Sequence, residues 1–262
     1  LHRRGVADVA WSTPLLTMVD ASVGGKTRVN LQAPLDGADV LLKNAVGMFH
    51  QPSLVVADVD LLETLPQRER RCGLAECIKH GLIAGINASG SLHPGAAEAS
   101  IRAVLEGDWS SVVEYVRENV ALKAGIVAGD EREDAEGDHP GRRALNLGHT
   151  FAHAVEACAH ARVRVDGALE HPAHGEAVGL GLLAAARLAE LVLDQVDDLR
   201  TRTAAVLERV GLPTRLSEAP EPAELIAAMR QDKKARSGRL RLVLPTPMGV
   251  TVVDDPGDAS LQ

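Results

Sequence analysis

A short segment of this chain, residues 146–153 (NLGHTFAH), carries two histidines four positions apart. In a helix His149 and His153 lie one above the other, a spacing that suits a metal ion or a bound anion. The segment matches the zinc-protease pattern H-E-x-x-H in spacing only, because Thr150 stands where that pattern needs its glutamate. Histidine pairs at this spacing also arise by chance, so the pair alone leaves both interpretations open.

Two further segments carry groups of the same kind. Residues 73–81 (GLAECIKHG) predict a helix on which Glu76, Lys79 and His80 share one face. An exposed Glu–Lys pair is the alternative interpretation of that face. His174 opens an apolar stretch beside a glycine, so a helix starting there would give the imidazole backbone room to face a ligand. An ordinary helix-start residue is the alternative there.

Together these segments offer one glutamate and two histidines from three separate helices. A three-ligand set of this kind leaves an open coordination position, as catalytic zinc sites require. A structural zinc would more often use cysteine, yet none of Cys72, Cys77 and Cys158 falls at ligand spacing. The pattern therefore favours a catalytic over a structural metal.

Positive charges form a second group of candidates. Residues 24–27 (GGKT) end like a phosphate-binding P-loop, but Asp20 stands where that motif needs its first glycine, which excludes a nucleoside-triphosphatase. The glycine pair still lets a backbone approach a ligand closely, with a flexible surface turn as the alternative. Lysine and arginine side chains suit the phosphate and carboxylate groups of a polyanionic substrate. The basic residues that stand out are Lys26, Lys43, Lys79, Arg142, Lys233 and Lys234.

The elements that must position these residues divide the chain in two. Residues 1–64 have the glycine and proline punctuation of strands and loops, with a buried strand expected at 54–58. From Leu65 the chain has helical spacing, followed by two short strands at 240–244 and 250–253. We therefore predict an α/β remnant (1–64) followed by a mainly α-helical metal- and substrate-binding domain (65–262). The helices are expected at about 67–86, 98–108, 110–128, 148–160, 174–194, 198–210 and 221–231.

Composition excludes several classes of protein. A net charge of −8 without a basic face argues against a nucleic-acid partner. The longest apolar run, 177–186, is too short to span a bilayer, and no signal peptide is visible. Three cysteines without a CxxC pair indicate reduced thiols, and hence a cytoplasmic protein.

The strings that carry these residues resemble 3-dehydroquinate synthase, a sugar-phosphate cyclase, in its usual order. NLGHTFAHA and GLAECIKHG are the most specific, and the similarity covers nearly the whole chain. The other matching strings are MVDASVGGKTRVN, KNAVGMFHQP, DLLETLPQRERR, DERE, HGEAVGLGLLAAARLAE and RLRLVLPTPMG. The resemblance implies the dehydroquinate synthase-like fold, a homodimer and a small sugar-phosphate substrate.

The resemblance also implies a role for each matching residue. It implies zinc or cobalt held by Glu76, His149 and His174. Catalytic groups would be Lys26, Lys79, Glu133, Arg142 and His153, with Glu133 and His153 as candidates for proton transfer. Further substrate contacts would come from Arg4, Asn44, Asn146, Lys233 and Lys234. The NAD side would use Thr13, Asp20, Lys43, Thr64, Leu65 and Glu69.

The implied reaction belongs to the shikimate pathway of chorismate and aromatic amino acid biosynthesis. Family members cyclise 3-deoxy-D-arabino-heptulosonate 7-phosphate to 3-dehydroquinate and release phosphate, a carbon–oxygen lyase reaction. NAD transiently oxidises a ring hydroxyl, and the metal lowers the cost of forming its alkoxide. The cationic residues fix the phosphate and carboxylate, so much of the catalysis is positioning.

Three departures from the family pattern bear on activity. The chain begins just before Arg4, so we expect the glycine-rich NAD loop and roughly 100 residues of α/β sheet to be missing. Residues 31–42 lengthen the link to Lys43, and residues 134–141 lengthen the loop after Glu133. Two alternatives therefore stay open. One is another sugar-phosphate cyclase, making an inosose or valiolone-type ring, and the other is an inactive metal-binding fragment.

Overall fold

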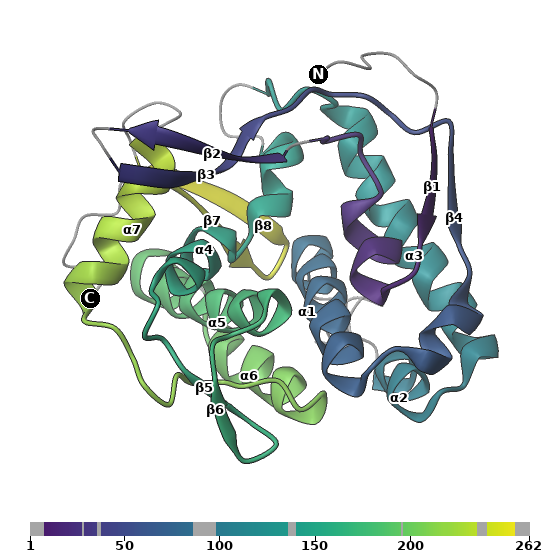
Figure 1. The fold of residues 1–262 in the computed structure, drawn as a ribbon. Helices are drawn as coiled ribbons and strands as arrows, with labels where there is room; N and C mark the ends of the chain where they lie inside the picture. Colours follow the sequence, from purple (N-terminus) through teal and green to yellow (C-terminus); the bar gives the residue numbers. More distant parts are fainter. Residues whose placement is uncertain are drawn as a thin grey trace.

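The structure is a computed structural model that describes residues 8–27, 29–35, 38–85, 98–135, 140–194, 196–234 and 240–254. Figure 1 shows a small strand-containing part formed by the N-terminal residues, beside a larger group of helices. The α/β remnant and the mainly helical part predicted from the sequence are therefore both present. The position of the boundary between them, near residue 64, stays a prediction.

The N-terminal part is built on a parallel pair of strands. β1 (Val9–Ser12) pairs with β4 (Leu54–Ala57), with Val9 opposite Leu54 and Ser12 opposite Ala57. Each strand is followed by a short helical segment: the π-helix η1 (Thr17–Ala21) after β1 and the 3-10 helix η2 (Val59–Thr64) after β4. The sequence predicted only strands and loops here, so both short helices are additions. They place residues 13 and 58–64 just beyond the carboxyl ends of the two strands.

A long hairpin connects these two strands. β2 (Val29–Leu35) and β3 (Ala38–Val46) pair antiparallel, and they contain the residues that lengthen the link at 31–42. The extra residues therefore extend the hairpin outward along its own ladder. Figure 1 shows β2 and β3 on the side of the molecule opposite α3.

Each helix predicted from sequence spacing is present, with ends within a few residues of those expected. One short strand pair lies between two of these helices, and a second pair follows the last helix. The helices are α1 (Gln67–Ala84), α2 (Glu98–Glu106), α3 (Trp109–Gly129), α4 (His149–Ala157), α5 (His174–Val192), α6 (Leu199–Arg209) and α7 (Pro222–Lys234), with the 3-10 helix η4 (Gly141–Asn146) before α4. The remaining strands are β5 (Val163–Val165), β6 (Ala168–Glu170), β7 (Arg241–Thr246) and β8 (Gly249–Asp254). None of these described helices is long and apolar enough to cross a membrane.

The core lies where α1 and α4 pack against α5, and glycine permits the close approach. A Cβ added to Gly175 of α5 would lie 2.3 Å from the Cα of Cys72 in α1. A Cβ added to Gly181 would lie 2.2 Å from the carbonyl oxygen of Gly148, at the start of α4. Because the aromatic content is only 2%, small aliphatic residues fill this core, and helix backbones can come together. This packing brings the first turns of α4 and α5 to the middle of α1.

Candidate active site

Three predicted metal ligands meet at this junction. Glu76 lies in the middle of α1, and His149 and His174 are the first residues of α4 and α5. One ligand atom from each residue lies within 4.8 Å of the others, so one metal ion could reach all three. Glu76 is fully buried, whereas the imidazole of His174 is 39% exposed. A ligand could therefore enter from the histidine side.

Both histidine rings are oriented by a second hydrogen bond. Nε2 of His174 lies 3.2 Å from Oε1 of Glu76, and Nε2 of His149 lies 3.5 Å from the same oxygen. On the far side of the rings, Nδ1 of His174 is 2.8 Å from Oε1 of Glu156, and Nδ1 of His149 is 3.2 Å from the carbonyl oxygen of Leu147. Outer partners of this kind fix the tautomer and the ring orientation of metal-bound histidines. The two Nε2 atoms are thus directed at one point.

Two of the three residues already have a charge state that suits a cation. Burial alone would raise the pKa of Glu76, but the charge of Lys79 and contacts with both histidines hold it well below its usual range. Burial and the charge of Lys79 lower the pKa of His149 to about 4, which leaves its ring neutral at pH 7. Metal ligands must be an anionic carboxylate and a neutral imidazole, so these two residues are already in the binding form. For His174, burial would lower the pKa, but hydrogen bonds with Glu156 and Glu76 raise it to about 10, so this ring must release a proton to bind a metal.

A buried row of charges connects the metal ligands to α3. Nζ of Lys79 lies 2.6 Å from Oε2 of Glu76 and 3.3 Å from Oδ2 of Asp20. Asp20 also contacts Nζ of Lys123 through both Oδ1 and its backbone oxygen. Burial would lower the pKa of Lys79, but Asp20 and Glu76 raise it, so this lysine stays a cation. Asp20 belongs to the π-helical turn η1, a conformation often found at functional sites.

Lys123 was not among the site residues predicted from the sequence. It lies within α3, in a stretch of alternating polar and apolar residues that resembles an ordinary surface helix, and no motif surrounds it. The residue is nevertheless only 7% exposed. The only signal was that this lysine occupies a position where the helical spacing of α3 places apolar residues. A lysine at such a position usually buries only its aliphatic stem and keeps its charge in water.

The predicted anion-binding residues form a second cluster. Nζ of Lys26 is 2.5 Å from Oε2 of Glu133, and the amide of Asn146 donates to Oε1 of the same carboxylate at 3.0 Å. Glu133 has a backbone φ of 62°, a left-handed conformation that non-glycine residues rarely adopt. Strain of this kind concentrates at functional sites, where the surrounding contacts maintain it. The lengthened loop after Glu133 therefore leaves its carboxylate beside Lys26.

Arg142 connects the loop just before Glu133 to the glycine pair. Its guanidinium donates to the carbonyl oxygen of Glu131 at 2.6 Å and to that of Gly24, and it lies 5.4 Å from the ring centroid of Phe49. Gly24 has a φ of +105°, and a Cβ there would lie 2.8 Å from an Arg142 nitrogen. The glycine pair therefore lets the backbone approach an arginine. The contact of Arg142 with a substrate remains a prediction.

The remaining predicted site residues fall into three groups. His153 lies on the next turn of α4, with its ring centroid 5.7 Å from that of His149, and is not part of the three-ligand set. Thr13, Thr64, Leu65 and Glu69 lie at exposed or half-buried positions following β1 and β4. Arg4 lies outside the described residues, and the side chains of Lys43, Asn44, Lys233 and Lys234 are not among those described.

His80 lies on the same continuous helix as Glu76 and Lys79 but contacts a residue of α3. Its Nδ1 lies 3.1 Å from Oδ1 of Asn119 in α3, and it does not join Glu76 and Lys79 at the metal ligands. Burial, followed by the charge of Lys79, lowers its pKa to about 4. The residue is therefore a neutral core histidine on the α3 side of α1.

The fold and the ligand set together define the class of protein. The chain superimposes on 2-epi-5-epi-valiolone synthase from Streptomyces hygroscopicus subsp. jinggangensis 5008 with a TM-score of 0.74 and 25% identity, covering 100% of this chain and 66% of the other. A 2-deoxy-scyllo-inosose synthase structure gives a TM-score of 0.72 at 21% identity, covering 95% of this chain and 65% of the other. The fold is thus that of the sugar-phosphate cyclases.

Sequence comparison gives the family. Residues 1–72 match the family profile "3-dehydroquinate synthase N-terminal", and residues 73–235 match "3-dehydroquinate synthase C-terminal". This chain belongs to the 3-dehydroquinate synthase family, which confirms the resemblance seen in its motifs.

Curated relatives agree with this assignment. The 3-dehydroquinate synthase of Caulobacter vibrioides is 43% identical over 255 residues, which is 95% of this chain and 62% of the relative. That of Rhizobium etli is 42% identical over 263 residues, which is 98% of this chain and 63% of the relative. The chain therefore spans somewhat less than two thirds of the length of the relatives it matches.

Proposed function

We propose that this chain carries the active site of a 3-dehydroquinate synthase, which cyclises 3-deoxy-D-arabino-heptulosonate 7-phosphate to 3-dehydroquinate and releases phosphate. The observation that carries the proposal is the meeting of Glu76, His149 and His174, with Lys79 in contact with the carboxylate. The relatives at 42–43% identity that bear this name support the choice of substrate. The reaction would place the protein in the biosynthesis of chorismate and the aromatic amino acids.

The ligand set fits a divalent metal, zinc or cobalt. One carboxylate and two imidazoles leave an open position, and mixed oxygen and nitrogen donors suit both ions. The valiolone synthase neighbour was solved with NAD+ and Zn2+, and the inosose synthase neighbour with NAD+ and Co2+. When bound, the metal would supply a Lewis acid that polarises a hydroxyl oxygen of the substrate. Glu156 and the carbonyl of Leu147 would hold the histidine rings in place for it.

The proposed NAD contacts follow the carboxyl ends of two parallel strands. Thr13 comes directly after β1, Thr64 is the last residue of η2, and Leu65 and Glu69 follow it. Ligands of open α/β sheets bind at this edge, so the placement suits a dinucleotide. NAD would supply the hydride acceptor and donor for the transient oxidation of the substrate. Asp20, assigned to the same side, touches Lys79 and Lys123 and would join the cofactor contacts to the metal ligands.

The remaining polar residues have roles in binding and in proton transfer. Lys26 and Asn146 contact the carboxylate of Glu133, and Lys79 adds a buried cation. Arg142 contacts the backbone of Glu131 and Gly24, close in the chain to Glu133 and Lys26. We assign these three cationic residues and Asn146 to holding the phosphate and carboxylate of the substrate, together with Arg4, Asn44, Lys233 and Lys234. The carboxylate of Glu133, held by Lys26 and Asn146, and the imidazole of His153 are the candidate proton carriers.

The deciding experiment is phosphate release from 3-deoxy-D-arabino-heptulosonate 7-phosphate by the 262-residue chain, supplied with zinc and NAD. We expect release that a chelator abolishes. Glu76→Gln, His149→Ala and His174→Ala should each reduce both bound zinc and release to background. The matched control is His160→Ala, because that imidazole is 58% exposed and contacts only Glu224 within the described residues. Retention of stoichiometric zinc by all three variants would contradict the ligand assignment.

Two alternatives have distinct outcomes in the same assay. The structural neighbours named for valiolone and inosose rings favour a related cyclase as second candidate. Turnover of a hexose 6-phosphate (for an inosose ring) or of a heptulose 7-phosphate (for a valiolone-type ring) in preference to the heptulosonate phosphate would establish that candidate. Stoichiometric zinc without turnover of any of these compounds would instead identify a metal-binding chain that is inactive by itself.

We further infer a cytoplasmic homodimer. The three cysteines are free and buried, as expected of a protein from a reducing compartment. Trp11 and Val9 of β1 are 65% and 60% exposed, and apolar surface of this kind commonly marks contact with another protein surface. Sedimentation equilibrium would test the dimer, and a monomer at micromolar concentration would contradict it.

A further inference from the structure

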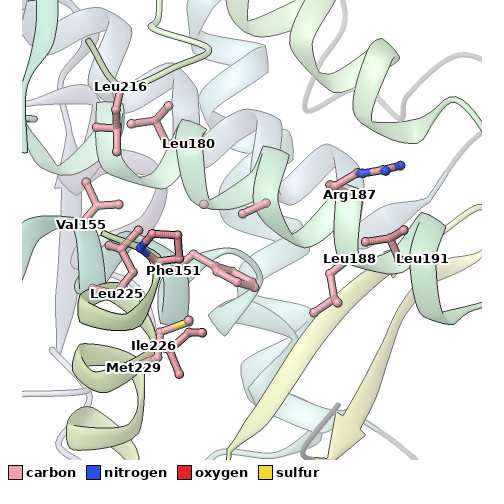
Figure 2. A pocket seen from close by; sticks show the side chains of 14 residues that line it. Phe151, Val155, Leu180, Arg187, Leu188, Leu191, Leu216, Leu225, Ile226 and Met229 are labelled. Carbon is pink, nitrogen blue, oxygen red and sulfur yellow. The ribbon is translucent and has the colours of Figure 1, made fainter. Parts of the chain in front are cut away.

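A cavity of about 510 Å³ lies among α4, α5 and α7, away from the metal ligands. Figure 2 shows the ring of Phe151 directed into it, with Leu225, Ile226 and Met229 of α7 along one side and Leu180, Leu188 and Leu191 of α5 along another. Protein interiors are packed nearly as densely as organic crystals, so a cavity of this size is unusual for a simple core. It falls within the range of small-molecule pockets, about 300–1,000 Å³.

The cavity and the metal ligands lie on opposite faces of α4. His149 and His153 are four residues apart on the face toward Glu76. Phe151, Ala154 and Val155 point the other way and line the cavity, as expected for positions about half a turn away on a helix. The cavity is therefore separate from the site assigned to the metal and sugar phosphate.

Small residues create the space. Ala154 of α4 and Ala184 of α5 stand where larger side chains would fill the gap between the helices. The opposite wall contains Met229, whose flexible side chain adapts to different shapes. The walls are thus suited to an apolar body of variable outline.

A single charge stands at one end of this apolar lining. Arg187 is the one charged residue among the lining residues described, and its side chain is 55% exposed. Its ionic contact within the described chain is to Oε2 of Glu190 at 3.6 Å, longer than a hydrogen bond. Glu190 also accepts the backbone N–H of Arg200 at 2.8 Å. A guanidinium has five donors, so Arg187 can still bind a carboxylate.

We propose that this cavity binds a small molecule with an apolar body and one anionic group, whose charge contacts Arg187. The proposal goes beyond the cyclase activity and does not depend on it. The positive charge of Arg187 favours an anionic group on the ligand, and the apolar walls of the cavity favour an apolar body. Because α4 and α5 also carry His149 and His174 at their first residues, the ligand would contact two of the three helices that hold the metal ligands.

The test uses the four methionines of the chain, labelled with carbon-13 at their methyl groups. Met229 lines the cavity, whereas Met18 is buried elsewhere in the core and Met248 is 92% exposed. Titration with 3-phenylpropanoate should move the Met229 signal alone, with a Kd of roughly millimolar for a ligand of that size. The neutral 3-phenylpropanamide should bind about tenfold more weakly, because it lacks the charge-assisted contact.

Two variants and one control complete the test. Ala184→Phe should fill the cavity and abolish the shift. Arg187→Gln changes an exposed residue and should make the acid and the amide bind equally. The control, Arg117→Gln, removes another exposed helical arginine in an i,i+3 ion pair, with Glu114, and should change nothing.

Three results would overturn the proposal. They are a Met229 signal that does not move, equal binding of acid and amide to the unchanged chain, and a shift that persists in Ala184→Phe. A Met229 shift that follows protein concentration and not ligand would indicate a second copy of the chain in the cavity, and would also overturn it.

Discussion

The carboxylate of Glu156 lies 2.8 Å from Nδ1 of His174, while Nε2 of the same ring lies 3.2 Å from Glu76. One imidazole therefore lies between two carboxylates, one on the side of the proposed metal and one behind it. A carboxylate behind a metal-bound histidine fixes the ring and makes the coordinating nitrogen more basic. Glu156 would thus act on a bound metal through His174, as a positioning residue.

We predict that Glu156→Gln lowers zinc affinity roughly ten- to a hundredfold while the fold is retained, because the ring loses its charged partner. Competition with a chromophoric chelator would measure the affinity, and circular dichroism would verify the fold. Glu106→Gln, an exposed position at the end of α2, is the matched control. Equal zinc affinities for Glu156→Gln and Glu106→Gln would show that His174 does not need its outer partner.

A second prediction concerns the contact that brings α5 to α1. The Cβ introduced by Gly175→Ala would lie 2.3 Å from the Cα of Cys72, so the two helices must separate. We expect a loss of about 2–3 kcal/mol in the free energy of unfolding, as for other overpacked cores. Zinc affinity should fall as well, because the separation moves His174 away from Glu76.

Gly125→Ala is the control for that experiment. It is also a helical glycine, in α3, but nothing lies within 4 Å of the added Cβ. There the change should be neutral or stabilising by up to about 1 kcal/mol, since alanine favours helices. Urea denaturation of both variants measures the difference. A Gly175→Ala protein as stable as the Gly125→Ala protein would contradict the close helix packing.

Local sequence patterns predicted much of this site. The spacing of apolar residues located all seven helices, and each metal ligand lies in a short motif at a helix start or on one helix face. Convergence of Glu76, His149 and His174 followed from the resemblance of those motifs to a known family. Geometry confirms that the three residues come together.

Contacts between distant segments could not be predicted in this way. Asp20 meets Lys123 across 103 residues, and neither lies in a pattern that names its partner. Glu156 of α4 lies behind His174 because of the way α4 crosses α5. Residue spacing within either helix does not encode that crossing. The π-helical turn that presents Asp20 has five residues, too few for a helical period to be visible.

A third prediction concerns pH and the thiol at the helix contact. Burial, followed by the charges of Glu176 and Glu69, raises the pKa of Cys72 to about 11 from an ordinary value of 9.0. Folding therefore favours the neutral thiol of Cys72. The thiol's contribution to the free energy of unfolding is complete below pH 9, and it is lost as the pH rises through 11. Alkylation of Cys72 by iodoacetamide should reach half its maximal rate near pH 11.

Peptide mass spectrometry would follow that reaction residue by residue. The urea-unfolded chain is the control, where the half-maximal rate should fall near the ordinary pKa of the thiol. A folded chain in which Cys72 reacts at pH 9 as fast as in urea would place this thiol in solvent, contrary to its position against Gly175.

A fourth prediction concerns the buried contact between Asp20 and Lys123. Lys123→Met removes a cation from Asp20, and Asp20→Asn removes the anion between two lysines. Breaking a buried ion pair by removing one partner costs about 3–5 kcal/mol, because the other charge stays desolvated. The double variant should lose less than the sum of the single ones, with a coupling energy of about 1–3 kcal/mol.

Urea denaturation of the four proteins in this cycle supplies the coupling energy. The exposed pair Arg117 and Glu114, tested by the same cycle, should show no measurable coupling, because water screens it. Additive losses for Asp20 and Lys123 would mean that they do not share a buried contact. If the coupling is found, Lys123→Met should also weaken zinc binding, because Asp20 would then draw Lys79 away from Glu76 and leave the ligand carboxylate less firmly held.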